Sequence, residues 1–486
     1  MQQVNFFRQH ALHDLAATRH IEHEAQRALP THTLMARAGL AVAKLALALA
    51  PHAKRIWVAA GPGNNGGDGL EAAMHLQQWG KNPVVTWLGS EETASSDTKI
   101  SYHQALDAGV SFSKSPPERY ELCIDALLGI GAQQREPVGP MADWIAHINS
   151  QSVPVLAVDV PTGLQGDTGT AGTTRVKASA TLSLLTLKPG LFTAHGRDLS
   201  GQVWFDDLQY TQVAAAAAPQ APGAWLAGEP NQAARPHASH KGSFGDVAVI
   251  GGATGMTGAA LLAASAALHG GAGRVFVSLL DEQTLTLDPM QPELMFRRLE
   301  TLALNTMSVV CGCGGGSAIS SQLPLLLKTS RDLVLDADAL NAIAHSAPLQ
   351  ELLCARGPQR QTTVLTPHPL EAARLLSCSA AEIQGNRLSC AQQLAQRFAC
   401  TVVLKGSGSV IVEPGKTPVI NPTGNARLAT AGTGDVLAGL LGAYLANGLN
   451  GFDAACHAVY QHGKVADLWP QGLALTASKL AHALTA

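Results

Sequence analysis

The chain repeats one pattern in both halves: a short run of aliphatic residues, then glycines, then a stretch with helical spacing. In the first half, RIWVAA at 55–60 leads into the glycine-rich segment 61–69, and an amphipathic stretch follows at 70–79. In the second half, DVAVIGG at 246–252 leads into a helical stretch in the same way. Near-continuous aliphatic strands that alternate with helices are typical of parallel sheets covered on both faces. The sequence therefore predicts an α/β fold in each half.

Further apolar runs continue this pattern along the chain. In the first half, after a helical opening over residues 12–50, we expect strands at 83–89, 121–129 and 153–161. In the second half we expect strand and loop units at 274–280, 307–316, 332–340, 362–369 and 400–415, and a glycine loop that opens a helix within 429–448. This order predicts two independent α/β domains.

The two halves are divided by a break in composition. Residues 213–239 are rich in Ala and Pro and have no sustained period, which is typical of a linker. We therefore expect a first domain at 1–213, a linker at 214–238 and a second domain at 239–486.

The balance of residue types excludes several classes of protein. Hydrophobic residues make up 46% of the 486 residues and charged residues only 14%, which is the opposite of a disordered chain. Lys and Arg total 33 against 36 Asp and Glu, without any run of basic residues, so we expect no nucleic-acid partner. The longest apolar segment, 41–50, is too short to span a membrane and contains Lys44. We therefore expect no membrane partner.

The cysteines and the N-terminal residues bear on the location of the protein. The eight cysteines form no paired CxxC pattern, which favours reduced thiols over disulfides or a zinc site. The opening MQQVNFFRQH lacks the apolar core of a secretory signal. We expect a cytoplasmic protein, and the low charge with an Ala-rich surface favours a homo-oligomer.

The segment GPGNNGGDG at 61–69 is the first candidate site. Gly61, Gly63 and Gly66 match the G-x-G-x-x-G pattern, in which backbone N–H groups and a helix N-terminus receive a pyrophosphate. An ordinary dinucleotide fingerprint has small residues at the positions that are polar here, which are Asn64, Asn65 and Asp68.

Oxygen-bearing side chains also follow two of the expected strands. Asp125 and Asp159 lie at strand ends, where α/β sites form, and Thr162 follows shortly after. Such hard oxygen ligands suit an alkali or alkaline-earth cation. The alternative is that these acids cap helices or stabilise turns.

These segments together resemble the NAD(P)H-hydrate epimerase family. The resemblance rests on LMARAG at 34–39, GPGNNGGDG, DALLGIG followed by Arg135, and VDVPTG, and it covers residues from about 10 to 210. It implies a Rossmann-like three-layer domain that binds a hydrated dinucleotide through Asn64, Asn65, Gly66, Gly67, Asp68, Gly129, Ile130, Gly131, Ala132, Gln133, Gln134, Arg135 and Asp159. It also implies a potassium ion (K⁺) held by Asn65, Asp125 and Thr162. Two departures are mild: Ala36 replaces a frequent acidic residue, and Thr162 replaces a frequent serine but keeps the hydroxyl.

The segment ATAGTGDVLAG carries the second candidate site. Gly432 and Gly434 precede Asp435 at the start of an apolar helix, which predicts an anion hole made of backbone N–H groups. A carboxylate beside such a hole is a candidate general base for phosphoryl transfer. The alternative is that Asp435 only caps the helix. Two further candidates are Lys405, in the tight turn of LKGSGSVI, and His368, which can equally be a structural histidine.

The second half resembles the ADP-dependent NAD(P)H-hydrate dehydratase family, which has a ribokinase-like α/β fold. The resemblance covers about 239 to 480 and rests on SHKGSFGDVAVIGG, GMTGAALLAASAALHGGAG, LDADALN, TPHPLEAARLL, VVLKGSGSVI and NPTGNARLATAGTGDVLAG. It implies an adenine-nucleotide site at Lys405, Gly406, Ser407, Gly408, Ser409 and Gly434. It implies contacts to the hydrated substrate from Ala259, Gly314, His368 and Asp435, with Asp435 catalytic, and it implies Mg²⁺. In two places the chain departs from the family: CGCGGGS at 311–317 lacks the proline and leucine of the usual GPGLG loop, and Leu370 stands where glycine is common.

Together the two resemblances imply the repair of hydrated NADH and NADPH. Water that adds across a ring double bond of the reduced nicotinamide gives R and S epimers at the new hydroxyl-bearing carbon. An epimerase would interconvert them, and a dehydratase would use ADP to phosphorylate the hydroxyl of the S epimer. Elimination would then restore NAD(P)H and leave AMP and phosphate, because phosphate is a better leaving group than water.

Two alternatives stay open at this point. A ribokinase-like small-molecule kinase fused to a dinucleotide-binding domain would explain GTGD but not the polar NNGGD segment. A redox enzyme with a Rossmann domain would explain G-x-G-x-x-G but not GTGD.

Overall fold

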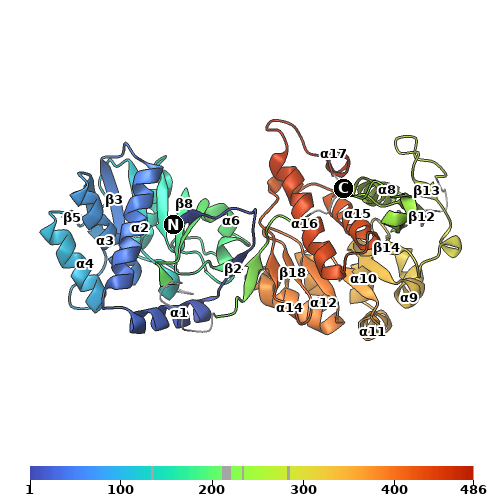
Figure 1. The fold of residues 1–486 in the computed structure, drawn as a ribbon, viewed down its shortest axis with the longest axis horizontal. Helices are drawn as coiled ribbons and strands as arrows, with labels where there is room; N and C mark the ends of the chain where they lie inside the picture. Colours follow the sequence, from blue (N-terminus) through green and yellow to red (C-terminus); the bar gives the residue numbers. More distant parts are fainter. Residues whose placement is uncertain (133–135, 211–219, 232–234, 282–284, 485–486) are drawn as a thin grey trace. The chain divides into compact units, whose positions relative to one another are not determined.

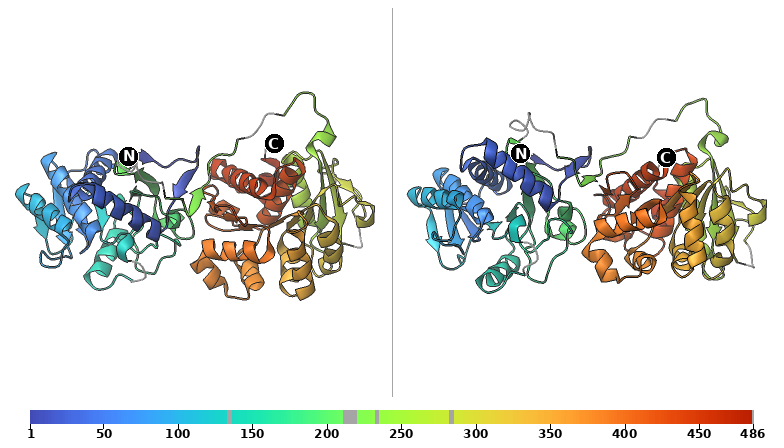
Figure 2. Two further views of the ribbon diagram at one scale, coloured as in Figure 1. Left: turned by 60° about the horizontal axis from the view of Figure 1, so that its bottom comes forward. Right: turned by 90° about the horizontal axis from the view of Figure 1, so that it is seen from below.

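The computed structural model describes residues 1–132, 136–210, 220–231, 235–281 and 285–484. The chain divides into two compact units, Met1–Leu226 and Ala227–Ala486. Each unit is a mostly parallel sheet with helices on both faces (Figures 1 and 2), so the expected α/β fold class is confirmed.

The sheet of the first unit has eight strands in the order β1-β9-β8-β7-β6-β3-β4-β5. All neighbours from β5 to β9 are parallel, and β1 is antiparallel to β9. The strands are β1 (Gln2–Gln3), β3 (Arg55–Ala60), β4 (Asn82–Trp87), β5 (Ser111–Ser113), β6 (Leu122–Ala126), β7 (Val155–Val158), β8 (Ala180–Leu184) and β9 (Gln202–Asp206). The helices are α1 (Leu15–Ala28), α2 (Thr33–Leu49), α3 (Asn64–Gln78), α4 (Ser96–Asp107), α5 (Pro140–Ser150) and α6 (Gly196–Leu199), with 3₁₀ turns η1 (Ile130–Ala132) and η2 (Pro189–Leu191).

Strand β3 shows how this sheet is covered on both faces. Ile56 and Val58 belong to the hydrophobic core on the side of α2 and α3. Trp57 points the other way and packs in the core that contains Trp144 and Ile145 of α5. Because successive side chains of a strand point to opposite faces, a strand buried on both sides must be apolar throughout, as RIWVAA nearly is.

The sheet of the second unit has the order β13-β12-β11-β14-β15-β16-β17-β18-β19. It is parallel from β13 to β17, and β18 and β19 follow as antiparallel strands. The strands are β11 (Asp246–Gly251), β12 (Arg274–Leu279), β13 (Met295–Phe296), β14 (Ser308–Cys311), β15 (Asp332–Leu335), β16 (Thr362–Leu365), β17 (Thr401–Leu404), β18 (Val410–Val412) and β19 (Val419–Ile420). The α-helices are α8 (Thr257–His269), α9 (Ile319–Thr329), α10 (Ala337–Ala344), α11 (Ala347–Arg356), α12 (Pro369–Leu376), α13 (Ala380–Gly385), α14 (Arg387–Phe398), α15 (Thr433–Ala446), α16 (Gly451–Leu468) and α17 (Ala477–His482), and the 3₁₀ turns are η4 (Lys241–Phe244), η5 (Leu299–Thr301) and η6 (Ala426–Leu428).

Helix α15, which begins at the predicted GTGD segment, packs closely against α8 and the sheet. A Cβ on Gly439 would lie 1.9 Å from the carbonyl oxygen of Ala263 in α8, and one on Gly442 would lie 2.4 Å from Val310 in β14. The glycines therefore let α15 approach both neighbours, which fixes the position of its N-terminus at the edge of the sheet.

The structure contains the expected strands and several others that were not predicted. Each expected strand segment contains a strand, and β3 has the expected bounds. Strands β8 and β9 of the first sheet were not expected. Within the segment expected as a linker, Ala224–Leu226 form β10, which pairs antiparallel with β2 (His10–Leu12).

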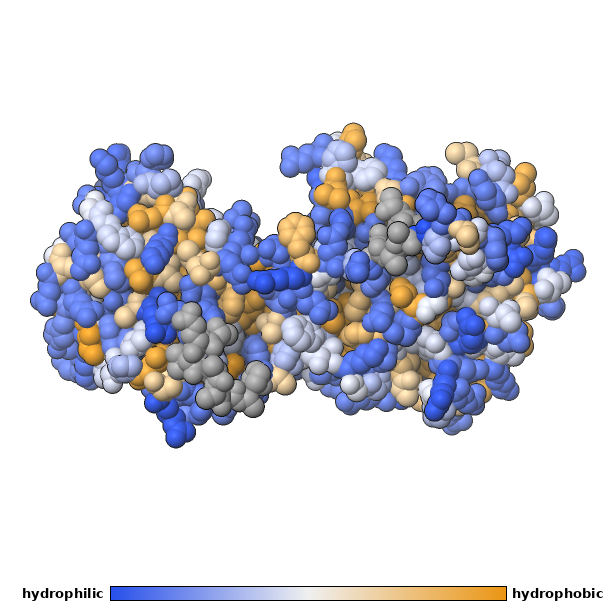
Figure 3. All heavy atoms as spheres, viewed as in Figure 1, coloured by the Kyte–Doolittle hydropathy of each residue, from blue (hydrophilic) through white to orange (hydrophobic). Residues whose placement is uncertain are grey.

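The long helical opening is two helices, because α1 ends before Pro30 and α2 starts after His32, whose φ is 70°. No single helix in the described part of the chain is long and apolar enough to cross a membrane. Helices α1 and α2 have the required length and composition only when they are taken together, and the pair is bent by 114°. On the face drawn in Figure 3, hydrophilic side chains predominate and hydrophobic ones lie scattered among them.

Candidate functional sites

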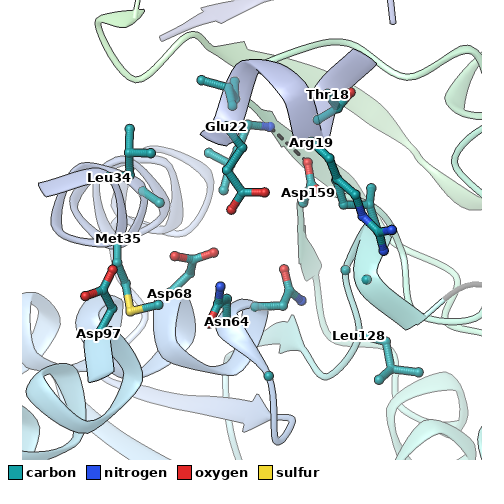
Figure 4. A pocket seen from close by; sticks show the side chains of 18 of the residues that line it. Thr18, Arg19, Glu22, Leu34, Met35, Asn64, Asp68, Asp97, Leu128 and Asp159 are labelled. Atoms are coloured by element: carbon teal, nitrogen blue, oxygen red, sulfur yellow. Dashed lines mark hydrogen bonds between the residues drawn. The ribbon is translucent and has the colours of Figure 1, made fainter. Parts of the chain in front are cut away.

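The first candidate site lies where the chain order reverses in the sheet of the first unit. From β3 the chain continues to β4 on one side, and it later returns to β6 on the other side of β3. Ligands of open α/β sheets bind at such a switch point, outside the carboxyl ends of the strands. A cavity of about 480 Å³ lies there (Figure 4). Its walls come from α1, α2, the first turn of α3 and the segments that follow β6 and β7.

The glycine segment after β3 is packed against the end of β6. A Cβ on Gly61 would lie 1.7 Å from the carbonyl oxygen of Leu127, and a Cβ on Gly66 would lie 2.0 Å from the carbonyl oxygen of Gly61. The loop expected over 61–69 is shorter than predicted, because α3 already begins at Asn64 with Gly63 as its N-cap. The predicted residues Asn64, Asn65, Gly66, Gly67 and Asp68 therefore begin a helix, and the free N–H groups of its first turn favour an anion.

Replacing Gly61 by alanine is expected to destabilise the first unit by about 1–3 kcal/mol or more, because the added methyl group overlaps the backbone carbonyl of Leu127, directly after β6. Denaturant unfolding followed by circular dichroism measures this change. Gly63→Ala is the matched control, since nothing lies within 4 Å of a Cβ there, and it should cost about 1 kcal/mol or less. Equal losses in the two variants would contradict the packing argument.

The segment after β6 forms a second wall of the cavity. Gly129, Ile130 and Gly131 line it, and Ala132 ends the 3₁₀ turn η1. The remaining predicted residues of this loop, Gln133, Gln134 and Arg135, lie outside the described residues.

Asp159 lies on the wall that follows β7 and is held by a buried lysine. Its φ of 67° is in the left-handed region, which few residues other than glycine adopt. Its carboxylate pairs with the ammonium of Lys188 and accepts a hydrogen bond from the Leu184 N–H at 3.2 Å. Lys188 is 1% exposed, and its Nζ also donates to the carbonyl oxygens of Leu184 at 2.7 Å and Thr186 at 3.0 Å.

No role was predicted for Lys188 from the sequence. The signal that could have marked it is a lysine directly after the uncharged segment 180–187, because a lysine buried beside such a segment requires a paired carboxylate. The structure supplies that carboxylate from Asp159, and the pair fixes one charged wall of the cavity.

Carboxyl groups gather around this cavity. Burial, with the nearby Asp159 and Glu22 carboxylates, raises the pKa of Asp68 well above its usual value. Burial and then Asp159 raise the pKa of Glu22 as well, while Lys188 and Arg19 oppose the shift. A site with this many acids accepts an anionic dinucleotide only if some of them carry protons or face a cation.

Asp125 and Thr162, two of the three predicted metal ligands, are in direct contact. Asp125 lies in β6 and is fully buried; it accepts hydrogen bonds from the Thr162 hydroxyl at 2.7 Å and the Thr162 N–H at 2.9 Å. Burial raises the pKa of Asp125 to about 6, and the hydrogen bonds from Thr162 and Leu127 oppose that rise. The alternative that Asp125 stabilises a turn therefore holds, but no basic side chain among the described residues pairs with it.

Asn65, the third predicted ligand, lies on the neighbouring segment. A Cβ on Gly129 would lie 2.9 Å from the Asn65 Oδ1, so its amide faces the loop after β6. Its buried Nδ2 has no hydrogen-bond partner in the described part of the chain. A buried carboxylate without a basic partner, a hydroxyl and an amide oxygen form a donor set that fits an alkali cation.

The second candidate site has the corresponding place in the second unit. From β11 the chain continues to β12, and it returns to β14 on the other side of β11, which again makes a switch point at the carboxyl ends of the strands. The turn after β14, the residues after β15, β16 and β17, and the N-terminus of α15 meet there.

Asp336, directly after β15, lies at the centre of this site. Its Oδ1 accepts hydrogen bonds from Lys405 Nζ at 2.6 Å and from the Thr366 hydroxyl at 2.8 Å. A Cβ on Gly434 would lie 3.4 Å from the same Nζ. The ammonium therefore lies beside the N-terminus of α15, where free N–H groups already favour an anion. The predicted residues Lys405 and Gly434 are thus brought together, whereas Asp336 was not predicted.

Asp435 lies in the first turn of α15 beside a buried thiol. One ligand atom from each of Cys313, Asp336 and Asp435 lies within 4.8 Å of the others. Burial, and then the Asp336 carboxylate, raise the pKa of Asp435 to about 6, while a hydrogen bond with Cys313 and the charge of Lys405 oppose the rise. The capping alternative for Asp435 is wrong, because Gly432 is the N-cap of α15 and no side chain caps that end.

The predicted nucleotide segment, Lys405 to Ser409, is the turn between β17 and β18. Gly406 and Gly408 in this turn have φ values of 136° and 63°. Arg387, which is 1% exposed, supports the turn from below: its guanidinium donates to the carbonyl oxygens of Leu404 and Lys405, both at 3.2 Å. This role of Arg387 was not predicted, because the contact joins elements that are separate in the sequence.

Of the three remaining predicted residues, Ala259 and Gly314 are neighbours and His368 caps a helix. A Cβ on Gly314, whose φ is 57°, would lie 2.9 Å from the Cβ of Ala259 in α8. His368 is the N-cap of α12: its Nδ1 accepts from the Leu370 and Glu371 N–H groups at 3.1 and 3.3 Å. The structural role left open for His368 is therefore present, and its Nε2 lies 3.2 Å from a Glu371 carboxylate oxygen.

Two family models match the chain, one in each unit. Residues 31–190 match the YjeF-related protein N-terminus, and residues 247–485 match NAD(P)H-hydrate dehydratase.

Relatives of known name match over both halves or over the second alone. The bifunctional NAD(P)H-hydrate repair enzyme of Escherichia coli is 36% identical over 465 residues, which covers 90% of this chain and 85% of that protein. The ADP-dependent (S)-NAD(P)H-hydrate dehydratase of Neisseria meningitidis is 41% identical over 256 residues, which covers 51% of this chain and 85% of that protein. Among solved structures, the ADP/ATP-dependent NAD(P)H-hydrate dehydratase from Bacillus subtilis, co-crystallised with ATP/Mg²⁺, is 29% identical with a TM-score of 0.45 and covers 51% of this chain and 90% of that one.

Proposed function

This chain belongs to the family of bifunctional NAD(P)H-hydrate repair enzymes, and we propose that each of its two sites catalyses one of the two reactions. The enzyme epimerises the R and S hydrates of NADH and NADPH, and it dehydrates the S hydrate in an ADP-dependent reaction that restores NAD(P)H. The first unit, with its cavity at the β3–β6 switch point, is the epimerase, and the second unit is the dehydratase.

In the epimerase the dinucleotide lies along the start of α3. Asn64 to Asp68 offer the free N–H groups of the first helical turn and two amide side chains to the pyrophosphate and its neighbours. Gly129, Ile130 and Gly131 line the same cavity with Asp159, and in this proposal the predicted residues from Gly129 to Arg135 contact the dinucleotide. The single observation that supports this most is the cavity itself, because its lining includes predicted residues from the start of α3, from the segment after β6 and from the segment after β7.

Asn65, Asp125 and Thr162 hold a potassium ion in this proposal. When bound, the ion would supply positive charge next to the Asp125 carboxylate and to an anionic substrate. The residues of the chain contribute the oxygen ligands and the orientation: the Thr162 hydroxyl and N–H fix the carboxylate. The fully buried Asp125, without a basic partner among the described residues, is the observation behind this step.

In the dehydratase, Asp435 takes the proton of the substrate hydroxyl as that oxygen attacks a phosphoryl group. A carboxylate with a pKa near 6 is mostly ionised at pH 7 and yet basic enough for this transfer. Lys405 and the N–H groups at the start of α15 stabilise the negative charge of the phosphoryl oxygens. Asp336 positions Lys405 through the 2.6 Å hydrogen bond.

The turn from Lys405 to Ser409, with Gly434, binds the adenine nucleotide, and Ala259, Gly314 and His368 contact the hydrated dinucleotide. Mg²⁺ would use carboxylate oxygens of Asp336 or Asp435 together with phosphate oxygens, whereas the Cys313 thiol is too soft a ligand for it. We also propose a cytoplasmic, homo-oligomeric enzyme; the eight cysteines are free thiols, which suits a reducing compartment.

Hydrated NADH with ADP is expected to regain the absorbance of reduced nicotinamide when the enzyme is added, with no redox partner present. With a mixture of epimers the recovery should exceed the S fraction, because the epimerase converts the R form. A small-molecule kinase would consume nucleotide without any such recovery, and a recovery that stops at the S fraction would contradict the epimerase assignment.

A further inference from the structure

Helix α1 carries a side chain into the epimerase cavity for which neither family resemblance assigns a role. Thr18 and Glu22 are four residues apart and therefore lie on one face of α1. Both line the cavity. Figure 4 shows the Glu22 carboxylate pointing into it, opposite Asp68 on α3 and near Asp159.

The position of α1 is fixed by contacts on the side of Lys188. The hydroxyls of Thr18 and Thr186 are hydrogen-bonded at 2.7 Å, and the Leu15 N–H donates to the Asp167 carboxylate at 2.8 Å. Since Thr186 also accepts a hydrogen bond from Lys188, α1 and the Asp159–Lys188 pair belong to one hydrogen-bonded framework. Glu22 is therefore presented by a rigid element, as a group that acts on a substrate must be.

Glu22 and Asp159, two acids that line the cavity, differ in their partners. Its carboxylate forms no hydrogen bond or ion pair with any residue that the structure describes, although the side chain is half-buried. Asp159, by contrast, is paired with Lys188, whereas Asp68 on α3 is half-buried and, like Glu22, has no hydrogen bond or ion pair with a described residue. An unpartnered carboxyl group at the wall of a cavity is available to a ligand, whereas a group that only stabilised the fold would be satisfied within it.

We propose that Glu22 is a catalytic residue of the epimerase: it donates a proton to the hydroxyl of the hydrated nicotinamide, and the Asp159 carboxylate accepts one on the return step. The inference rests on the proposed epimerase function of the first unit. Two carboxyl groups held in different environments are a common arrangement for acid and base roles.

The step balances with the hydrate alone. Addition of water to an enamine places the hydroxyl on the ring carbon bonded to nitrogen. Glu22 protonates this hydroxyl, the C–O bond breaks with its electron pair on oxygen, and the nitrogen lone pair forms a C=N bond. Water then adds to the opposite face of that carbon, the C=N pair returns to nitrogen, and Asp159 takes the released proton. Proton exchange through water restores both carboxyl groups, and nothing is oxidised or reduced.

The charges around Glu22 agree with this role. Arg19 on α1, Lys188, Asp68, Asp97 on α4 and Asp159 are the charged groups that line the same cavity. Burial and Asp159 together outweigh the two basic groups and raise the pKa of Glu22. A raised pKa increases the protonated fraction near neutral pH, which a proton donor needs.

The test is to compare Glu22→Gln with the full-length parent in an assay that omits ADP, so that no dehydration occurs, and to follow conversion of R to S hydrate by chromatography. We expect kcat for epimerisation to fall roughly 10²–10⁴-fold with KM within a few-fold. The decline of the parent's kcat as pH rises through the pKa of the acid should be absent in the variant. Glu24→Gln is the matched control, because Glu24 lies on the same helix in an exposed ion pair with Arg27 and should leave kcat unchanged.

A second variant separates chemistry from packing. In Glu22→Ala, formate should restore part of the epimerase rate by entering the space of the missing carboxyl group, which a purely structural role would not allow. Dehydratase activity on the S hydrate with ADP should equal that of the parent in every variant. A kcat within threefold of the parent in Glu22→Gln, or a lost rate that formate does not restore, would overturn the assignment of Glu22. A parent that does not epimerise at all would instead overturn the proposed function.

Discussion

Asp435→Asn is expected to lower the dehydratase rate roughly 10²–10⁴-fold, the usual range for the loss of a positioned acid or base. Asparagine keeps the size of the side chain but cannot accept the proton of the substrate hydroxyl. The carboxylate lies in the first turn of α15, next to the Lys405 ammonium and the free N–H groups that would receive the phosphoryl group. Steady-state assays with hydrated NADH and ADP measure the change in rate.

The same variant should not be less stable than the parent at neutral pH. Burial and Asp336 raise the pKa of Asp435 to about 6 in the folded protein, so its ionised form opposes folding above that pH, and removal of the charge relieves this cost. The parent rate should rise with pH through about 6 as the base ionises, and the variant should lack that limb. Asp453→Asn is the matched control, since Asp453 occupies the first turn of the neighbouring helix α16. A variant that keeps its rate within tenfold would move the base elsewhere.

Asp125→Asn is expected to abolish the response of the first unit to potassium and to remove most epimerase activity. In the parent, potassium at 100 times its dissociation constant should stabilise the folded unit by about 2.7 kcal/mol. The variant should gain nothing, because an amide does not supply the negative charge of the fully buried carboxylate. Thermal unfolding with potassium, against the same concentration of lithium, measures the difference.

Thr162 supplies a matched pair of variants for the same test. Thr162→Ser keeps the hydroxyl that bonds to Asp125 and should keep the potassium response, whereas the isosteric Thr162→Val should lose it. An unchanged response in Asp125→Asn, or equal responses in the serine and valine variants, would contradict a potassium site built on these residues.

The strands and strand-end residues that could be predicted from the sequence are those determined by neighbouring residues along the chain. RIWVAA forms β3 over the expected residues because it is buried on both faces, and Asp125 and Asp159 reach the switch point because their strands end there. The strand Ala180–Leu184 was missed because it contains Thr181 and Ser183. These hydroxyls are buried but satisfied by the carbonyl oxygens of Ser200 and Thr186, a compensation that the sequence alone does not reveal.

Residues whose role depends on a distant partner were also missed. Lys188 pairs with Asp159, 29 positions earlier, and Asp336 pairs with Lys405, 69 positions later. In the sequence, Glu22 is one of several charged residues of an amphipathic helix. Its side chain points toward the cavity because α1 packs over the carboxyl end of the sheet. Periodicity predicts the elements, but pairs of this kind follow from the topology that joins the elements.

The Cys313 thiol beside Asp435 bears on how the enzyme reacts with oxidants and alkylating reagents. Burial, followed by the carboxylates of Asp435 and Asp336, raises the pKa of Cys313 well above its usual value. The nucleophilic form of a cysteine is the thiolate, and oxidants and alkylating reagents act on that form. An enzyme that restores damaged reduced cofactors thus carries, beside its proposed catalytic base, a thiol that is expected to react slowly with oxidants and alkylating reagents.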